Sequence, residues 1–331
     1  MFLTAANVFH YLLEKRFAAA EDVVDNRFTV HALSRRNLNF HVAAGAREYL
    51  VKQVRKWDPD GRISIEREAS VYWQARTNPS LAPVAALAPE CYAWDPIHAI
   101  LIIEYLPGHS EIYDLADRFD PHLARIAGRA MGAFHRAMHS ADYMELFPEE
   151  TPWHLSMHET GEDDIAELSA GRRELIRAVR RHPEFGEALQ GLRAEWAATA
   201  VIQGDWKLDN CLVPAERDRV RLVDWEFACW GDPAWDLASM LQSYWNFWIT
   251  SPEDQGIEEI RPALRALLEG YGDDRTARKA LRFAGARMLQ TAFEHLERAD
   301  RMTPAAVRLL QGSLTILSRP DWAADQLLGA A

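Results

Sequence analysis

A polar loop between short apolar segments constrains the fold of this 331-residue chain more than any other feature. Residues 201–224 read VIQGDWKLDNCLVPAERDRVRLVD, so Asn210 follows Asp205 by five positions and Asp224 ends a later apolar segment. If CLV and VRLV pair as an antiparallel hairpin, Asn210 at the start of one strand lies next to Asp224 at the end of the other. The pattern therefore predicts that Asp205, Asn210 and Asp224 gather at one end of a hairpin.

These three side chains suit phosphoryl transfer. Mg²⁺ binds one or two carboxylate or amide oxygens of a protein and leaves its other positions to water and substrate phosphates. Asn210 and Asp224 match such a pair of ligands, and Asp205 then remains to orient and deprotonate an attacking hydroxyl. The alternative is a polar turn whose Asp and Asn bond the local backbone. A turn explains each residue singly, but it does not explain the set at this spacing.

The same segment resembles the paired motifs of the aminoglycoside phosphotransferase and choline kinase superfamily, whose fold is similar to that of protein kinases. IQGDWKLDNCLV corresponds to His-Gly-Asp with Asn five residues on, and VRLVDWEFACWGDPAWDLA contains Asp-Trp-Glu, Gly-Asp-Pro and Asp-Leu-Ala. The resemblance implies that Asp205 is the catalytic base and that Asn210 and Asp224 bind Mg²⁺. It also implies that Asp236 anchors the loop through backbone hydrogen bonds. Gln203 replaces the family's His, so a structural role survives there and a role that needs charge does not.

The pattern along the chain predicts an α+β fold, and the resemblance makes it a bilobal, protein-kinase-like one. Residues 39–54 favour two strands that turn at Ala44-Gly45, residues 62–75 favour a helix, and residues 91–108 favour a hairpin that turns at Asp95-Pro96. After Pro107-Gly108 the pattern is mainly helical. We therefore expect a small β-rich lobe over 1–106 and a larger, mainly helical lobe over 107–331.

The resemblance also assigns ATP-binding residues to the first lobe. A kinase-like site needs a strand Lys that meets the ATP phosphates and a helix Glu that holds this Lys. Lys52 ends the alternating strand YLVK, and Glu68 lies on the following predicted helix. Glu66 is the competing partner, but the family's Arg-Glu-Ala pattern favours Glu68.

Two further segments complete the expected nucleotide site. SRRNLNFHV resembles the family's phosphate-covering Ser-Asn loop, which assigns Ser34 and Asn37 to the phosphates, although the segment lacks glycine and carries two arginines. The apolar strand AILIIEYL would be the hinge between the lobes, where the backbone of Glu104 and Leu106 meets adenine.

The charge distribution bears on the acceptor. Residues 1–106 contain 12 Lys+Arg and 12 Asp+Glu, so the whole net charge of -12 falls in residues 107–331. Such a field repels nucleic acid and attracts a cationic acceptor, unless it serves only solubility. SYWNFWIT places Tyr244, Trp245 and Trp248 where the family builds its acceptor pocket. These aromatic residues either form a wall for a cation or a peptide side chain, or belong to a helix core.

A second resemblance concerns the kind of acceptor. NVFHYLLEKRF, SRRNLNFHV and YLVKQ look similar to kinases of thioamitide and lyase-dependent lanthipeptide pathways, in which a precursor-peptide Ser or Thr is phosphorylated before elimination. The acceptor hydroxyl is therefore expected on a small molecule or on a peptide Ser or Thr.

The alternative from another class is a catalytically inactive, kinase-like scaffold that only binds nucleotide. Gln203 and the glycine-free loop would permit it. The joint presence of Lys52, Asp205, Asn210 and Asp224 favours an active enzyme that uses ATP and Mg²⁺.

The sequence also indicates where the protein works. It holds no run of roughly eighteen apolar residues, and polar residues interrupt the N-terminal segment too early for a secretory signal. We therefore expect a cytoplasmic protein with no membrane partner.

Overall fold

The computed structural model describes residues 1–33, 37–55, 58–250 and 256–328. The chain divides into two compact units. The first comprises Met1–Ser110, Leu212–Glu216 and Arg221–Ala228, and the second comprises Glu111–Cys211, Arg217–Val220 and Cys229–Ala331. The expected boundary after residue 106 divides the chain once. The first unit observed here also includes two short segments that follow residue 211.

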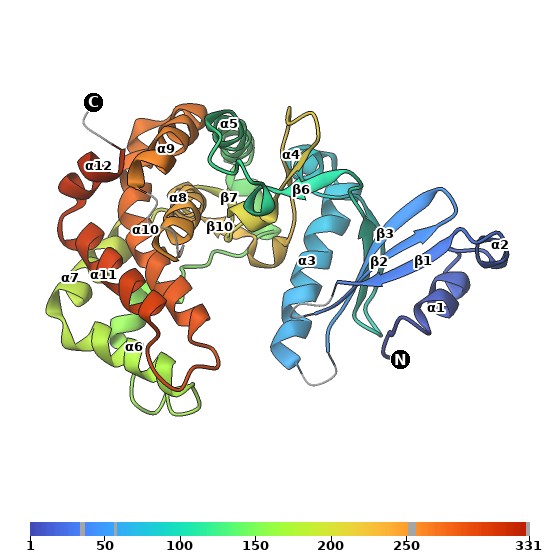
Figure 1. The fold of residues 1–331 in the computed structure, drawn as a ribbon, viewed down its shortest axis with the longest axis horizontal. Coiled ribbons are helices and arrows are strands. Elements are labelled where there is room, and N and C mark those ends of the chain that lie inside the picture. The colour runs from blue at the N-terminus through green and yellow to red at the C-terminus, as the bar shows by residue number, and fades with distance from the viewer. Residues whose placement is uncertain (34–36, 56–57, 251–255, 329–331) are drawn as a thin grey trace. The chain divides into compact units, whose positions relative to one another are not determined.

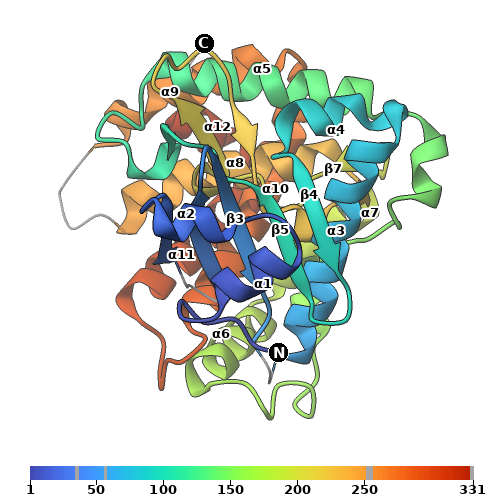
Figure 2. The ribbon, with the colours of Figure 1, turned by 90° about the vertical axis from the view of Figure 1, so that its right-hand side faces the viewer.

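An antiparallel sheet forms the centre of the first unit, and Figure 2 faces it. Its strand order is β1-β2-β3-β5-β4. The strands are β1 (Phe28–Ala32), β2 (Leu38–Ala44), β3 (Arg47–Gln53), β4 (Cys91–Asp95) and β5 (Ile100–Glu104). The two predicted hairpins are confirmed as β2–β3 and β4–β5, and Gly45 turns the first of them with a φ of 64°. Strand β1 was not predicted.

Helices cover both faces of this sheet (Figure 1). Helix α1 (Val8–Glu14) packs Val8 and Leu12 against alternate strand residues such as Val42 and Val51. Helix α3 (Pro59–Thr77) covers the other face. Because successive strand residues point to opposite faces, Lys52, the neighbour of Val51, points toward α3.

The remaining parts of the first unit bring residue 224 to α3. Two short helices are α2 (Ala20–Val24) and α4 (Ala82–Leu87), the latter after the 3-10 turn η1 (Pro79–Leu81). A small sheet of order β6-β8-β9 consists of β6 (His109–Glu111), β8 (Cys211–Pro214) and β9 (Arg221–Leu222). The predicted segments CLV and VRLV therefore pair in part, since only Arg221–Leu222 of the second segment forms a strand beside β8. The 3-10 turn η6 (Trp225–Phe227) follows and contacts α3.

The second unit is mainly helical. Strands β7 (Ala200–Ile202) and β10 (Cys229–Gly231) pair antiparallel beside its helices. The helices are α5 (Pro121–Ala137), α6 (Ala170–Arg181), α7 (Pro183–Glu195), α8 (Pro233–Thr250), α9 (Ile257–Tyr271), α10 (Asp274–His295), α11 (Pro304–Ser318) and α12 (Pro320–Leu328). The 3-10 turns described in this unit are η2 (Ile112–Asp114), η3 (Ala141–Glu145), η4 (Trp153–Glu159) and η5 (Leu208–Asn210). Helix α10 packs against α8 and α11, so it runs through the core of the unit.

The observed fold is the predicted α+β one, with a small sheet unit and a larger helical unit. Within the ranges that the structure describes, none of the helices combines the length and apolarity that a bilayer span requires.

Candidate active site

Lys52 lies at the centre of a triad in the first unit. Its ammonium is 2.8 and 2.9 Å from the two oxygens of Glu68, and 2.6 Å from Oδ1 of Asp224. The Lys52 and Glu68 side chains are buried, whereas that of Asp224 is 47% exposed. Glu66, the competing partner, pairs instead with Arg62 at 2.8 Å. Of the two candidate partners, Glu68 is the one that contacts Lys52.

The triad places one ammonium between two carboxylates. Burial would lower the pKa of Lys52, but the charges of Asp224 and Glu68 raise it above its ordinary value, so Lys52 stays protonated. Burial raises the pKa of Glu68, and the Lys52 charge only partly opposes this rise. The triad therefore carries an excess of negative charge, which a divalent cation at the half-exposed Asp224 would offset.

The backbone of Asp224 is in the left-handed region, with φ 57° and ψ 63°. Asp is one of the few residues other than Gly that adopt this conformation at moderate cost. The turn is held locally because the indole N–H of Trp225 donates to the Leu222 carbonyl at 2.9 Å. Such conformations persist where the surrounding structure fixes them, and they cluster at functional sites.

The two predicted metal ligands, each taken in its own unit, offer the oxygen donors that Mg²⁺ prefers. Asp224 meets Lys52 through Oδ1, and its half-exposed side chain puts a carboxylate within reach of a cation from solvent. Asn210 is buried, and its amide nitrogen donates to the Asp205 carbonyl at 2.9 Å and to Oδ2 of Asp205 at 3.3 Å. These two bonds use the nitrogen and leave the Asn210 amide oxygen as a metal donor. The residues present therefore fit the expected ion.

Asp236 holds the loop before Asp205 by its backbone. The fully buried carboxylate accepts from the N–H groups of Gln203 and Gly204, each at 2.8 Å. Gly204 has a φ of 85°, a conformation that glycine adopts without strain. The Gln203 side-chain oxygen accepts from the Asp205 N–H at 2.8 Å. The anchoring contacts expected of Asp236 are present, and Gln203 supports the loop without needing a charge.

Two cations flank the carboxylate of Asp205. Arg287 donates to Oδ1 at 2.7 Å, and the Lys207 ammonium lies 2.7 Å from Oδ2. Burial would raise the pKa of Asp205, but the Lys207 and Arg287 charges outweigh it and hold the pKa below its ordinary value. Asp205 is therefore ionised at neutral pH. The Arg287 side chain is buried, whereas that of Lys207 is 30% exposed and is the partner that can move.

Sequence reasoning missed Arg287. It lies on α10 in the segment AGARMLQ, where Ala286 and Met288 are buried, and its guanidinium is 5.3 Å from the Trp235 ring. A single cation inside an otherwise apolar helical run is the signal that would have found it, because a charge is rarely buried unless it is paired.

Two histidines near the loop were also missed. His135 is buried on α5, with ring nitrogens 3.1 Å from Oδ2 of Asp236 and 3.1 Å from the Tyr271 hydroxyl. His154 is buried too, and burial lowers its pKa well below the usual value, with Arg287 adding to the effect. His154 is therefore neutral. Nothing in the local sequence around either histidine indicates these contacts.

The other residues predicted to bind nucleotide are Ser34, Asn37, Glu104 and Leu106, and the structure describes three of these four. Ser34 lies outside the described residues, and Asn37 is half-buried in the first unit. The Glu104 N–H donates to the Glu90 carbonyl at 2.8 Å, so it is already used. Across the part of the chain that the structure describes, the Leu106 N–H donates no hydrogen bond. The adenine contact expected of the Glu104 and Leu106 backbone therefore stays a prediction, for which the Leu106 N–H and the Glu104 carbonyl are the groups to consider.

The aromatic segment of α8 divides between core and surface. Tyr244 and Trp245 are fully buried, which is the arrangement of a helix core and leaves no open face for an acceptor. Trp248 is half-buried. The proposal of an aromatic wall is therefore corrected for Tyr244 and Trp245 and kept only for Trp248.

A sheet unit with a buried Lys–Glu pair and a helical unit with a backbone-anchored Asp define a phosphotransferase of protein-kinase-like fold. The chain belongs to the phosphotransferase enzyme family, which matches residues 28–282. The suspected superfamily and the predicted class of activity are both confirmed by this match.

Solved structures show the same fold. A choline/ethanolamine kinase family protein from Mesorhizobium loti is 18% identical with a TM-score of 0.60, over 97% of this chain and 98% of that one. An ethanolamine kinase from Plasmodium vivax is 15% identical with a TM-score of 0.63, over 97% and 91%. An amicoumacin kinase in complex with AMP-PNP, Ca²⁺ and Ami is 11% identical with a TM-score of 0.59, over 94% and 96%. Among curated proteins, none matches this sequence.

Proposed function

We propose that this phosphotransferase uses ATP and Mg²⁺ and moves the γ-phosphoryl group to a hydroxyl of a small molecule or of a peptide Ser or Thr. The observation that carries the proposal is the triad of Lys52, Glu68 and Asp224. A buried Lys held by a helix Glu is the part of a kinase that meets the ATP phosphates, and Asp224 adds an exposed carboxylate for the metal.

In this proposal the first unit holds the nucleotide. Lys52 binds the phosphates, Glu68 keeps its ammonium in place, and the Leu106 N–H meets adenine. Asp224 and Asn210 would supply oxygens to Mg²⁺, which when bound neutralises charge on the phosphates. The similar amicoumacin kinase was solved with a nucleotide and a divalent cation, which supports this use of the fold.

Asp205 binds the acceptor hydroxyl and takes up its proton. The hydroxyl donates to Oδ2 after Lys207 moves aside, while Arg287 stays on Oδ1. As the acceptor oxygen bonds to the γ-phosphorus, the bond to the ADP oxygen breaks and the hydroxyl proton passes to Asp205. Asn210 and Arg287 together fix the carboxylate in one orientation, which supplies the positioning that such a transfer needs.

The acceptor is proposed to be cationic, because the excess of acidic residues falls entirely after residue 106. The names of the similar structures include choline, ethanolamine and antibiotic kinases. They support a small-molecule acceptor, and the resemblance to peptide-modifying kinases supports a Ser or Thr hydroxyl.

The test is intact mass spectrometry of acceptors after incubation with ATP and Mg²⁺. The panel holds choline, aminoglycosides and Ser/Thr peptides of both charges, and ADP release is followed in parallel. Asp205→Asn should reduce phosphorylation by about a hundredfold or more, the scale of general-base loss, and keep ATP binding. Asp218→Asn, an exposed Asp in the turn between β8 and β9, is the matched control and should change nothing.

Two results would contradict the proposal. Normal turnover of Asp205→Asn would remove Asp205 from the chemistry. Tight ATP binding by the parent protein, with no phosphorylated product and no ADP above background, would favour the inactive scaffold.

A further inference from the structure

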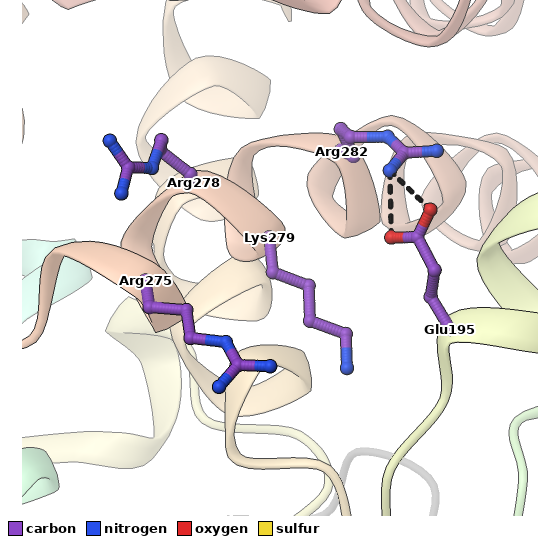
Figure 3. A pocket seen from close by; sticks show the side chains of 5 residues that line it. All are labelled: Glu195, Arg275, Arg278, Lys279 and Arg282. Atoms are coloured by element: carbon purple, nitrogen blue, oxygen red, sulfur yellow. Dashed lines mark hydrogen bonds and ion pairs between the residues drawn. The ribbon is translucent and has the colours of Figure 1, made fainter.

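Four cations occupy one face of the first two turns of α10. Arg278, Lys279 and Arg282 follow Arg275 by three, four and seven residues, spacings that place all four on the same side of the helix. With Glu195 at the end of α7 they line a pocket of about 310 Å³, shown in Figure 3. The pocket lies wholly within the second unit.

Only two of the four cations are neutralised by neighbours. Arg282 forms a bidentate pair with Glu195 at 2.6 and 2.7 Å. Lys279 pairs with Asp232, whose carboxylate also accepts from the Ala234 N–H. The guanidinium groups of Arg275 and Arg278 form no ion pair with any side chain in the described ranges, and both residues are exposed. The pocket therefore keeps an excess of positive charge.

This placement works against the stability of α10. Like charges three or four residues apart on a helix repel one another, and the cluster contains several such pairs. Cations near a helix N-terminus also oppose the helix dipole, and Arg275 lies in the first turn. Elsewhere the same unit has a large excess of acidic residues, so the cluster departs from the general surface composition.

The pocket is separate from the candidate active site. Arg287, which contacts Asp205, follows Arg278 by nine residues, or about two and a half turns at 3.6 residues per turn. The two arginines therefore lie on opposite sides of α10. Arg287 is buried and Arg278 is exposed, as this geometry requires.

We propose that this pocket docks an extended acidic segment of a polypeptide. Arginine guanidinium groups bind carboxylate oxygens in bidentate fashion, and those of Arg275 and Arg278 form no ion pair among the described residues. Between these two residues the helix rises about 4.5 Å at 1.5 Å per residue, and the positive face continues to Arg282, about 10 Å from Arg275. That length matches about three residues of an extended chain at roughly 3.3 Å each. One acidic segment therefore follows the whole face, with neighbouring carboxylates on Arg275 and Arg278.

The experiment measures the fluorescence anisotropy of a labelled hexaglutamate peptide on the full-length protein. Arg275→Glu with Arg278→Glu should weaken binding by about tenfold or more, because both unpaired forks are lost and the charge is reversed. Arg275→Gln with Arg278→Gln should show a smaller loss and provides a milder variant. The control, Arg129→Glu with Arg181→Glu, makes the same change of charge at exposed arginines on α5 and α6 and should bind as the parent does. Binding should also weaken as salt rises.

Three results would overturn the proposal. Unchanged binding by both pocket variants would show that the peptide binds elsewhere. An equal loss in the control would show a response to net charge alone. Tighter binding of inorganic phosphate or of a single-stranded oligonucleotide than of the peptide, competing at the same pocket, would assign the arginines to a different anion.

Discussion

The Asp205 carboxylate lies between two cations, the partly exposed Lys207 and the buried Arg287, and their charges decide how it titrates. Burial acts to raise its pKa, whereas Lys207 and Arg287 lower it. An Asp whose pKa is lowered in the folded protein is ionised above that pKa and becomes protonated only as the pH falls through it. As the proposed base, Asp205 should therefore limit turnover of the parent protein only in acid, below its ordinary pKa of about 3.9.

Replacing Arg287 should reveal how burial raises the pKa of Asp205. In Arg287→Met one of the two lowering charges is lost, so the pKa of Asp205 should rise. The acid limb of the kcat profile should move to higher pH with it. The measurement is kcat from about pH 3.5 to 8, with Arg298→Met, an exposed arginine, as the control. A profile that is lower at every pH but unshifted would show that Arg287 supports only the fold.

Gln203 tests whether the departure from the family motif matters. Its side-chain oxygen accepts from the Asp205 N–H, a task that a neutral imidazole nitrogen also performs. Gln203→His should therefore stay within a few-fold of the parent in kcat. Gln203→Ala leaves that buried N–H without a partner, and it should lower the free energy of unfolding by about 1–3 kcal/mol. A large gain of activity in Gln203→His would indicate a degraded enzyme.

At the scale of elements, Asp95 joins α1 to the β4–β5 turn. Its carboxylate accepts from the Tyr11 hydroxyl at 3.2 Å and from the N–H groups of Ile97 and His98 at 3.1 Å. The Lys15 ammonium lies 3.2 Å away. Burial would raise the pKa of Asp95, but the hydrogen bonds from His98 and its other partners outweigh it and lower the pKa. One side chain thus fastens a helix to a turn that lies eighty residues later in the chain.

Asp95→Asn should therefore destabilise the protein in a pH-dependent way. Removing the charge weakens these hydrogen bonds and should cost about 1–3 kcal/mol at pH 7. Because the pKa is lowered on folding, this stability is present above the unfolded pKa of about 3.9 and is lost as the pH falls through the folded value. Urea unfolding at pH 7 and at pH 3.5 measures the difference, with the exposed Asp25→Asn as the control. A deficit that is the same at both pH values would contradict the role of the charge.

The same elements show how far local sequence reaches. The β2–β3 and β4–β5 hairpins were predictable because alternation and turn residues are local signals. Strand β1 was missed although Phe28 and Val30 alternate with polar residues, because the pattern is only five residues long and none of its residues is fully buried. The Lys52–Glu68 pair was found only through the resemblance, since sixteen residues separate the partners. Arg287 could not be placed beside Asp205, because eighty-two residues intervene and only tertiary packing brings them together.

At the scale of the whole molecule, net charge is distributed unevenly along the chain, and so are the residues proposed for nucleotide and for acceptor. The first 106 residues are neutral overall, and the remainder holds the net charge of -12. Lys52 and Glu68, which are proposed to serve the nucleotide, belong to the neutral part of the sequence. Asp224 and Asp205 belong to the acidic part. Salt should therefore affect the two substrates differently.

The acceptor KM should rise as ionic strength goes from low to physiological values, whereas the KM for MgATP changes less. An acidic field concentrates cations, and salt screens it over a Debye length of about 8 Å at physiological strength. In the proposed function the ATP phosphates are instead met by Lys52, a buried cation that bulk salt screens weakly. Stacking of a cation on the half-buried Trp248 would add about 0.5–2 kcal/mol, so Trp248→Ala should raise the acceptor KM and spare that of ATP. The exposed Trp322→Ala is the control. An acceptor KM that is indifferent to salt, or an anionic acceptor, would show that the acidic residues only keep the protein in solution and that the site selects by shape.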